Sequence, residues 1–290
     1  MKKILWLSLA IVFLAVLFYL LKTGDEMEIQ VGSSLIPQRI ISLGPPITES
    51  LYLLGVEDKL MANTTYCIRP KEARDKEKIG DTMRANLEEI INIKPDLVLA
   101  TSLSNPKQTQ RLRDLGIEVI SFSDPANFSQ LCRDFLKLGK IVGQEKESVD
   151  IVQNARERVD AVQQRIRDLP GTKALVQIGA RPLWVAPGDS FIDDLVRMAG
   201  GINIGPFGKS GLYSLEEVLK ANPDVIIIAT MGIVGQTEKK SWQRYKSINA
   251  VKENRIYIMD SYKLCSPTAV TFVEALEEIA EILHPNEVAR

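Results

Sequence analysis

A fifteen-residue segment occurs twice in this chain of 290 residues, and the repeat constrains the fold more than any other feature. Residues 86–100 read Asn-Leu-Glu-Glu-Ile-Ile-Asn-Ile-Lys-Pro-Asp-Leu-Val-Leu-Ala, and 128 positions later residues 214–228 read Ser-Leu-Glu-Glu-Val-Leu-Lys-Ala-Asn-Pro-Asp-Val-Ile-Ile-Ile. Each copy predicts an N-cap (Asn86 or Ser214), a short helix, a Pro-Asp turn and a buried strand. Two copies so far apart indicate two lobes of related architecture.

Short apolar runs alternate with amphipathic stretches along the rest of the chain. A strand is predicted at residues 39–43, and a helix from Ile47 to Leu54 follows it and ends at Gly55. Further strands are predicted at Leu97 to Ala100, Val119 to Phe122, Ala174 to Ile178, Val225 to Ala229 and Ile256 to Met259. This alternation is typical of an α/β fold whose parallel sheets are covered by helices on both faces.

A long amphipathic helix is predicted from Ser148 to Leu169, between the two repeat copies. Its apolar residues recur at spacings of three and four and form one narrow stripe: Val152, Ala155, Val159, Val162, Ile166 and Leu169. Such a helix spans about 33 Å, which suits a stiff connector between lobes, although a peripheral helix on a single domain remains an alternative. The predicted parts are a signal or anchor segment with its linker (1–30), an N-terminal lobe (37–142), the interlobe helix (143–170) and a C-terminal lobe (171–286).

The N-terminus carries an export or anchoring signal. Lys2 and Lys3 precede an apolar run from Ile4 to Leu21, and an acidic stretch follows Lys22. Because the run is longer than a secretory signal of about 7 to 15 residues, an uncleaved membrane anchor at residues 4–21 is the first interpretation. A cleaved signal and a buried core helix are the alternatives. In the first two cases the charge pattern places the rest of the chain outside the cytoplasm.

The composition excludes several classes of protein. Thirty-six basic and thirty-seven acidic residues leave no positive excess for nucleic acid. Three cysteines and one histidine, His284, are too few for a clustered zinc or iron-sulfur site or for a serine triad. The run from Gly205 to Ser210 lacks the first glycine of a phosphate-binding loop. A disulfide between Cys67 and Cys132 stays open as an alternative to free thiols.

Candidate ligand contacts lie in the loops that follow predicted strands, because ligands of open α/β sheets bind beyond the carboxyl ends of the strands. Their aromatic, methionine and arginine side chains suit a large, partly apolar and partly anionic ligand, although ordinary packing explains each one alone. The predicted ligand-binding residues are Tyr66, Asp81, Thr82, Met83, Arg84, Arg181, Trp184 and Tyr262; the pair Met231-Gly232 also follows a strand.

The chain resembles the Fe/B12 class of periplasmic substrate-binding proteins of ABC importers over about residues 38–283. The resemblance is carried by residues 39–55, by Asn86-Leu-Glu88, Lys94-Pro-Asp-Leu-Val98, Phe191-Ile-Asp-Asp-Leu195, Ala199-Gly-Gly-Ile-Asn203 and Ser214-Leu-Glu216. It implies two Rossmann-like lobes joined by a single long helix. It also implies a monomer without cofactor or enzymatic activity, which captures a metal chelate, a corrinoid such as cobalamin or a ferric siderophore, and delivers it to a permease and its ATPase.

The resemblance also implies roles for individual residues. The glutamates that engage permease arginines in relatives fall on Glu88 and Glu216; the neighbouring pair, Glu89 and Glu217, is the less favoured alternative. A cleft tyrosine of vitamin B12 binders aligns with Tyr66, whereas a tryptophan of theirs is replaced by Thr82, which weakens a cobalamin assignment.

The ligand class and the function each have alternatives. Arg84 and Arg181 suit an anionic siderophore, and the position of His284 outside the cleft loops disfavours haem. A membrane-tethered sensor or scaffold on the same fold is one rival function. A cofactor enzyme that uses Cys67 and Cys265 is the other rival.

Overall fold

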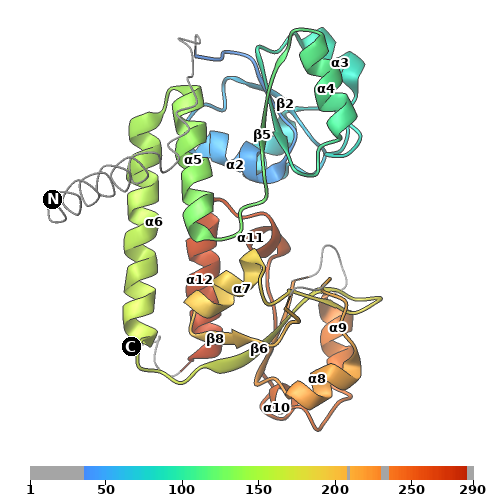
Figure 1. Cartoon of the computed structure of the whole chain (residues 1–290), viewed down its shortest axis with the longest axis vertical. Helices are drawn as coiled ribbons and strands as arrows, with labels where there is room; N and C mark the ends of the chain where they lie inside the picture. The colour runs from blue at the N-terminus through green and yellow to red at the C-terminus, as the bar shows by residue number, and fades with distance from the viewer. Residues whose placement is uncertain (1–35, 208–209, 230–234, 286–290) are drawn as a thin grey trace, which may run out of the picture. The chain divides into compact units, whose positions relative to one another are not determined.

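The computed structural model describes residues 36–207, 210–229 and 235–285, which contain two five-stranded sheets (Figure 1). The two repeat copies contribute strand β4 (Leu97–Thr101) to one sheet and strand β9 (Val225–Ile228) to the other. This confirms the two predicted lobes. The predicted signal or anchor segment, together with Met231-Gly232, lies outside the described residues. None of the described helices has the length and apolar character that crossing a membrane requires.

The N-terminal sheet is parallel throughout and has the strand order β3-β2-β1-β4-β5. Its other strands are β1 (Ile40–Ser42), β2 (Leu60–Asn63), β3 (Glu77–Lys78) and β5 (Glu118–Phe122). Its helices are α2 (Pro45–Leu53), a 3₁₀ turn (Lys71–Asp75), α3 (Leu87–Ile93), α4 (Pro106–Asp114) and α5 (Phe128–Val142). Strands β2 and β3 are not among the predicted strands, because they are short and β3 is polar.

The C-terminal sheet has the strand order β10-β9-β6-β7, and β8 also pairs with β6. Its remaining strands are β6 (Thr172–Gly179), β7 (Trp184–Val185), β8 (Gly201–Asn203) and β10 (Ile256–Ile258). Its helices are α7 (Phe191–Met198), α8 (Leu215–Ala221), α9 (Gly235–Trp242), α10 (Asn249–Lys252), α11 (Ser261–Cys265) and α12 (Ala269–Leu283). Strand β7 departs from the expected parallel arrangement, because a connection of only residues 180–183 returns the chain antiparallel to β6.

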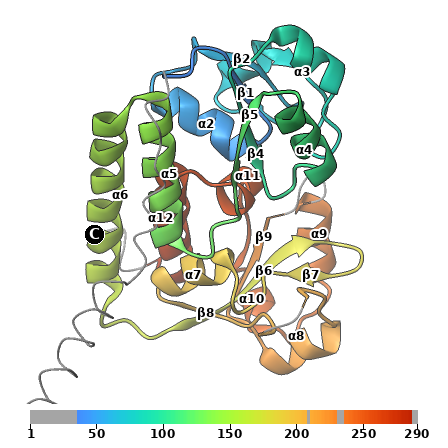
Figure 2. The same cartoon turned by 45° about the horizontal axis from the view of Figure 1, so that its top comes forward.

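Alternate residues of the central strands face opposite sides of each sheet. In the N-terminal lobe Ile40 and Leu97 pack toward α2 and α5, whereas Ile41 and Val98 pack toward α3 and α4 (Figure 2). In the C-terminal lobe the inner face packs toward α7 and α12, and the outer face packs toward α8, α9 and α10. The two inner faces share one apolar core with α5, α6 and α12, so the lobes are firmly connected.

The connecting helix α6 spans Glu145–Ile166 and runs alongside α5 and α12 (Figure 1). The predicted stripe is confirmed as far as Ile166, since those apolar residues are buried. The helix lies three residues earlier than predicted; Glu145 and Glu147 occupy its first turn, where the helix dipole favours acidic side chains. Arg158 of α6 forms a bidentate ion pair with Glu277 of α12, with nitrogen–oxygen distances of 3.0 and 2.7 Å.

The two repeat copies adopt the predicted local structure. Asn86 accepts hydrogen bonds from two backbone amides of the first turn of α3, and Ser214 forms a capping box with Glu217 in α8. The aspartates of the two Pro-Asp turns also act alike. Asp96 accepts hydrogen bonds from the amides of residues 38 and 39 at the start of β1, and Asp224 accepts one from the Lys173 amide in β6. Each repeat therefore ties its own strand to the neighbouring strand.

Candidate functional site

A cavity of about 450 Å³ lies where the loops of the N-terminal sheet meet helix α11 of the C-terminal lobe. It is lined by Pro45, Tyr66, Asp81, Thr82, Met83, Leu103, Ser261, Tyr262, Cys265 and Ser266. The N-terminal residues come from the loops after β1, β2, β3 and β4, and α11 follows β10. This is the edge at which open α/β sheets bind their ligands.

The loop after β3 is built by its own backbone geometry. The Asp81 carboxylate accepts hydrogen bonds from the amides of Met83 (2.8 Å) and Arg84 (2.7 Å), which turns the chain back toward α3. Gly80 has a φ of +96°, and a Cβ there would lie 2.5 Å from the Arg84 carbonyl oxygen. The turn leaves Met83 59% exposed at the cavity, so an apolar side chain is available to a ligand.

Two polar contacts join the lobes beside the cavity. The Tyr262 hydroxyl donates a hydrogen bond of 3.1 Å to the backbone oxygen of Tyr66, and Tyr66 as a whole residue is 55% exposed. Arg69 lies 3.5 Å from Asp260, whose carboxylate also accepts a hydrogen bond from the Tyr262 amide at the start of α11. Burial raises the pKa of the Tyr262 hydroxyl, so it remains a hydrogen-bond donor at neutral pH.

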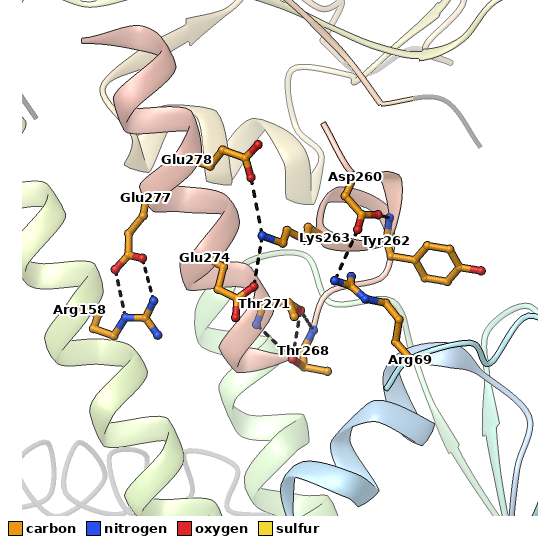
Figure 3. A network of polar contacts seen from close by, with 10 residues as sticks. All are labelled: Arg69, Arg158, Asp260, Tyr262, Lys263, Thr268, Thr271, Glu274, Glu277 and Glu278. Atoms are coloured by element: carbon orange, nitrogen blue, oxygen red, sulfur yellow. Dashed lines mark hydrogen bonds and ion pairs between the residues drawn. The ribbon is translucent and has the colours of Figure 1, made fainter. Parts of the chain in front are cut away.

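A network of charged and hydroxyl side chains holds α11 against α12 (Figure 3). Lys263 of α11 reaches Glu274 at 3.3 Å and Glu278 at 3.8 Å, so its ammonium group lies between two carboxylates of α12. The first turn of α12 is capped by Thr268 and Thr271, each of which accepts a hydrogen bond from the backbone amide of the other. These contacts fix the part of the C-terminal lobe that lines the cavity.

Glu49 of α2 faces the same charged region. Burial raises the pKa of the Glu49 carboxyl, and the negative charges of Glu274 and Asp260 act in the same direction, while Arg69 opposes them. The carboxylate of Glu49 is therefore costly to keep ionised in the folded protein.

A second cavity of about 160 Å³ adjoins the first one and shares Pro45, Thr82, Leu103, Cys265 and Ser266 with it. Its remaining lining is largely apolar and comes from α2, β5, α5 and the start of α12. The Thr101 hydroxyl in this lining is buried and has no hydrogen-bond partner among the described residues. Burial raises the pKa of Asp134, the acidic residue of α5 in the lining. The two adjoining cavities both have largely apolar linings.

The three cysteines are free in the structure, and the alternative disulfide between Cys67 and Cys132 is not formed. Surrounding protein atoms shield the Cys265 thiol from water, and this desolvation raises its pKa to about 11. His284 is buried at the end of α12 and lines neither cavity. The described residues hold no group of three or more histidine, cysteine, aspartate or glutamate side chains arranged to bind a metal ion.

The cavities contain only part of the predicted ligand-binding set. Five predicted residues line the larger cavity: Tyr66, Asp81, Thr82, Met83 and Tyr262. Arg84 is an exposed residue of the loop after β3, and Arg181 and Trp184 lie on the turn and strand after β6; none of these three lines either cavity. Pro45, Leu103 and the residues of α11 other than Tyr262 were missed, although all of them follow strands and the same rule would have included them. The ligand-binding role of the whole set stays a prediction.

Glu88 and Glu216 occupy equivalent exposed positions on α3 and α8. Neither side chain forms a hydrogen bond or an ion pair with another described residue. Glu217, by contrast, accepts hydrogen bonds from the amide and the hydroxyl of Ser214, so its carboxylate is already engaged. The geometry therefore favours Glu88 and Glu216 over the neighbouring pair for contact with a partner.

Residues 40–263, which include both sheets, match the periplasmic binding protein family. An ABC transporter substrate-binding lipoprotein of Bacillus subtilis, YvrC, is 30% identical over 258 residues, which cover 86% of this chain and 81% of that protein. The vitamin B12-binding protein of Photorhabdus laumondii is 31% identical over 198 residues, which cover 67% of this chain and 71% of that protein.

Solved structures share the same fold. The structure of a possible iron-binding periplasmic protein of Staphylococcus epidermidis has a TM-score of 0.75 and 26% identity, and the match covers 86% of this chain and all of that one. A periplasmic haem-binding protein of Pseudomonas aeruginosa has a TM-score of 0.77 and 21% identity, and the match covers 87% of this chain and 94% of that one. The chain therefore shares its overall fold with these two solved structures.

Proposed function

Because the chain belongs to the periplasmic binding protein family, we propose that it captures a metal chelate in its interlobe cavity and delivers it to the permease of an ABC importer. The chain is a substrate-binding protein of the ABC-transporter type, similar to proteins named for vitamin B12, haem and iron. The proposed chelate is a corrinoid or a ferric siderophore. The protein acts outside the cytoplasm, anchored through residues 4–21, and carries out no chemical step itself.

The single observation that supports this proposal most directly is the lining of the larger cavity. Aromatic, methionine, leucine and proline side chains meet hydroxyl groups there, which suits a bulky ligand with apolar faces and a polar edge. Asp81 is the charged side chain of the described lining, and its carboxylate is engaged by the loop. Because Arg84 and Arg181 do not line either cavity, a corrinoid fits the lining better than an anionic siderophore does.

The two free glutamates supply the docking contacts in this proposal. Glu88 and Glu216 lie on repeat-related helices, one in each lobe, so they present matched negative charges to a partner made of two equivalent halves. Neither glutamate lines either cavity, so delivery can be separated from capture by substitution.

The ligand is tested by purifying the chain from its native cells and recording an absorption spectrum, since corrinoids, ferric chelates and haem absorb differently. Titration with cyanocobalamin and with a ferric siderophore, followed by tryptophan fluorescence, then ranks the two candidates. Bound corrinoid and saturable quenching by cyanocobalamin are expected. A colourless protein that responds to neither chelate would remove the proposed ligand class.

Delivery is tested with the double variant Glu88→Ala and Glu216→Ala. Chelate affinity is expected to stay unchanged, while uptake falls, because the two residues lie outside both cavities. A parallel loss of affinity would contradict the separation of capture and delivery. Normal uptake in a strain that lacks the protein, together with altered signalling, would favour a membrane-tethered sensor.

A further inference from the structure

The two helices that carry the free glutamates also expose one large apolar side chain each, at equivalent positions of the repeat. Ile91 of α3 is 41% exposed, and Leu219 of α8, which lies 128 positions later, is 39% exposed. Single exposed apolar residues are common on protein surfaces and need no explanation. Here, however, both copies of the repeat expose a large apolar residue at the same position.

Each apolar residue shares a helix face with a glutamate. Residues three apart on a helix are neighbours, so Glu88 lies beside Ile91 and Glu216 lies beside Leu219. The preceding residues, Ile90 and Val218, are fully buried against the outer faces of the two sheets. In both lobes the glutamate and the apolar residue therefore face solvent, while the buried neighbour, Ile90 or Val218, attaches the helix to the core.

We infer that Glu88 with Ile91, and Glu216 with Leu219, form two equivalent docking patches that bind one partner with two equivalent halves. Each half of that partner offers an arginine or lysine next to an apolar pocket. The carboxylates supply orientation and rate of encounter, while burial of the isoleucine and leucine supplies affinity. This inference rests on the proposed function, because it names the permease as the partner, and it adds the apolar contacts that hold the complex together.

The chain contains its own matched control. Asn92 and Lys220 are also equivalent in the repeat and are exposed on the same helices, one residue beyond the apolar pair. These two side chains lie four residues after Glu88 and Glu216 and so border the patches, but they point about 100° away from Ile91 and Leu219, and they therefore test whether an effect belongs to the apolar side chains rather than to any substitution on that face. Residues 91, 92, 219 and 220 all lie on the surface, so their substitution leaves the core intact. Glutamine is a good helix former, so the helices are preserved as well.

The first experiment uses the part of the chain from residue 36 onward, whose described residues form a compact unit, so that the proposed anchor at residues 4–21 does not itself bind the membrane. It measures binding of this purified part to membrane vesicles from the native cells after deletion of the chromosomal copy. Ile91→Gln with Leu219→Gln is expected to weaken saturable binding by about tenfold or more, since buried apolar anchors dominate interface affinity. Asn92→Gln with Lys220→Gln is expected to change it by less than about twofold. Equal effects of the two double variants, or no effect of the first one, would overturn the inference.

A second experiment identifies the partner and its symmetry. A benzoylphenylalanine photo-crosslinker is placed at residue 91 or at residue 219, with residue 163, which is exposed on α6, as the control. Crosslinks from both test positions to the same integral membrane polypeptide, identified by mass spectrometry, would support two equivalent patches. Crosslinks from one lobe only, to a soluble protein, or to nothing would contradict them.

The two proposals fail in distinguishable ways. If cyanocobalamin and ferric siderophores do not bind, the proposed ligand class falls while the membrane-binding measurement still reports on the patches. If Glu88→Gln with Glu216→Gln abolishes membrane binding and the apolar double variant does not, docking stands and the apolar contribution is wrong.

Discussion

The hydroxyl of Tyr262 donates a 3.1 Å hydrogen bond to the backbone oxygen of Tyr66, and this contact joins the two lobes beside the larger cavity. Both residues also line that cavity. A ligand that enters between the lobes therefore meets the residues that hold them together. Because the lobes share the apolar core around α5, α6 and α12, we expect only small adjustments of the lobes on binding.

Removal of this hydrogen bond tests how much it restrains α11. Tyr262→Phe is expected to speed amide hydrogen exchange in residues 261–266 by at most about fivefold, because a partly exposed hydrogen bond contributes about 1 kcal/mol or less. The matched control is Tyr257→Phe, whose hydroxyl has no hydrogen-bond partner in the described part of the chain. Unchanged exchange in Tyr262→Phe would show that the contact does not restrain the helix.

The raised pKa of Glu49 gives a pH-dependent prediction. The folded protein holds a proton on this carboxyl at pH values where the unfolded chain has released it, so the contribution of Glu49 to the free energy of unfolding grows as the pH falls through its raised pKa toward 4.5. Glu49→Gln is therefore expected to stabilise the protein at pH 7 and to lose that advantage near pH 4.

Urea unfolding of the wild type and of Glu49→Gln at several pH values measures this difference. Glu281→Gln, at an exposed position of α12, serves as the control and is expected to change stability by less than about 0.5 kcal/mol. A difference between Glu49→Gln and the wild type that is constant from pH 4 to pH 7 would show that the carboxyl is not strained by burial.

The ion pair between Arg158 and Glu277 is expected to couple α6 to α12. A double-mutant cycle with Arg158→Met and Glu277→Gln should give a coupling free energy of about 0.5 to 1 kcal/mol, since the pair is bidentate but about one third exposed. The coupling should decrease with salt. The exposed pair Lys146 and Asp150 on the same helix is the comparison, and an equal coupling there would mean that bidentate geometry adds nothing.

The pKa of about 11 predicts that the Cys265 thiol reacts slowly with alkylating reagents. At pH 8 its thiolate fraction is about 100-fold below that of an ordinary cysteine with a pKa near 9, so alkylation by iodoacetamide should be slower by a similar factor. Mass spectrometry after timed alkylation, with the urea-unfolded chain as the reference, measures this. Because Cys265 lines both cavities, a bound chelate should slow the reaction further. Alkylation as fast as in the unfolded chain would contradict the raised pKa.

Much of the fold follows from the sequence because its signals are local. The N-caps Asn86 and Ser214, the Pro-Asp turns and the apolar strands were all visible in the repeat, and the structure contains each of them. The apolar stripe of α6 was visible for the same reason. Strands β2, β3, β7 and β8 escaped prediction, because short strands depend on neighbours in the sheet more than on their own residues.

The site was harder to predict than the fold. The rule that ligands bind beyond the ends of parallel strands selected Tyr66, Thr82 and Met83, which line the larger cavity, but it also selected Arg181 and Trp184, which do not. Strand order alone does not show which loops reach across to the other lobe. That depends on the path of the chain after β10, where α11 and α12 cross toward the N-terminal lobe.

The sequence by itself determined that this chain forms two α/β lobes with a long helix between them, since backbone capping, proline and apolar periodicity act over a few residues. Only the tertiary structure decided that Tyr66 and Tyr262, 196 residues apart, meet at one cavity, and that Glu216 is free while Glu217 is engaged. Packing of α12 against α6 and α5 brings those distant loops together, and such packing depends on side-chain shape across the whole core rather than on any local pattern.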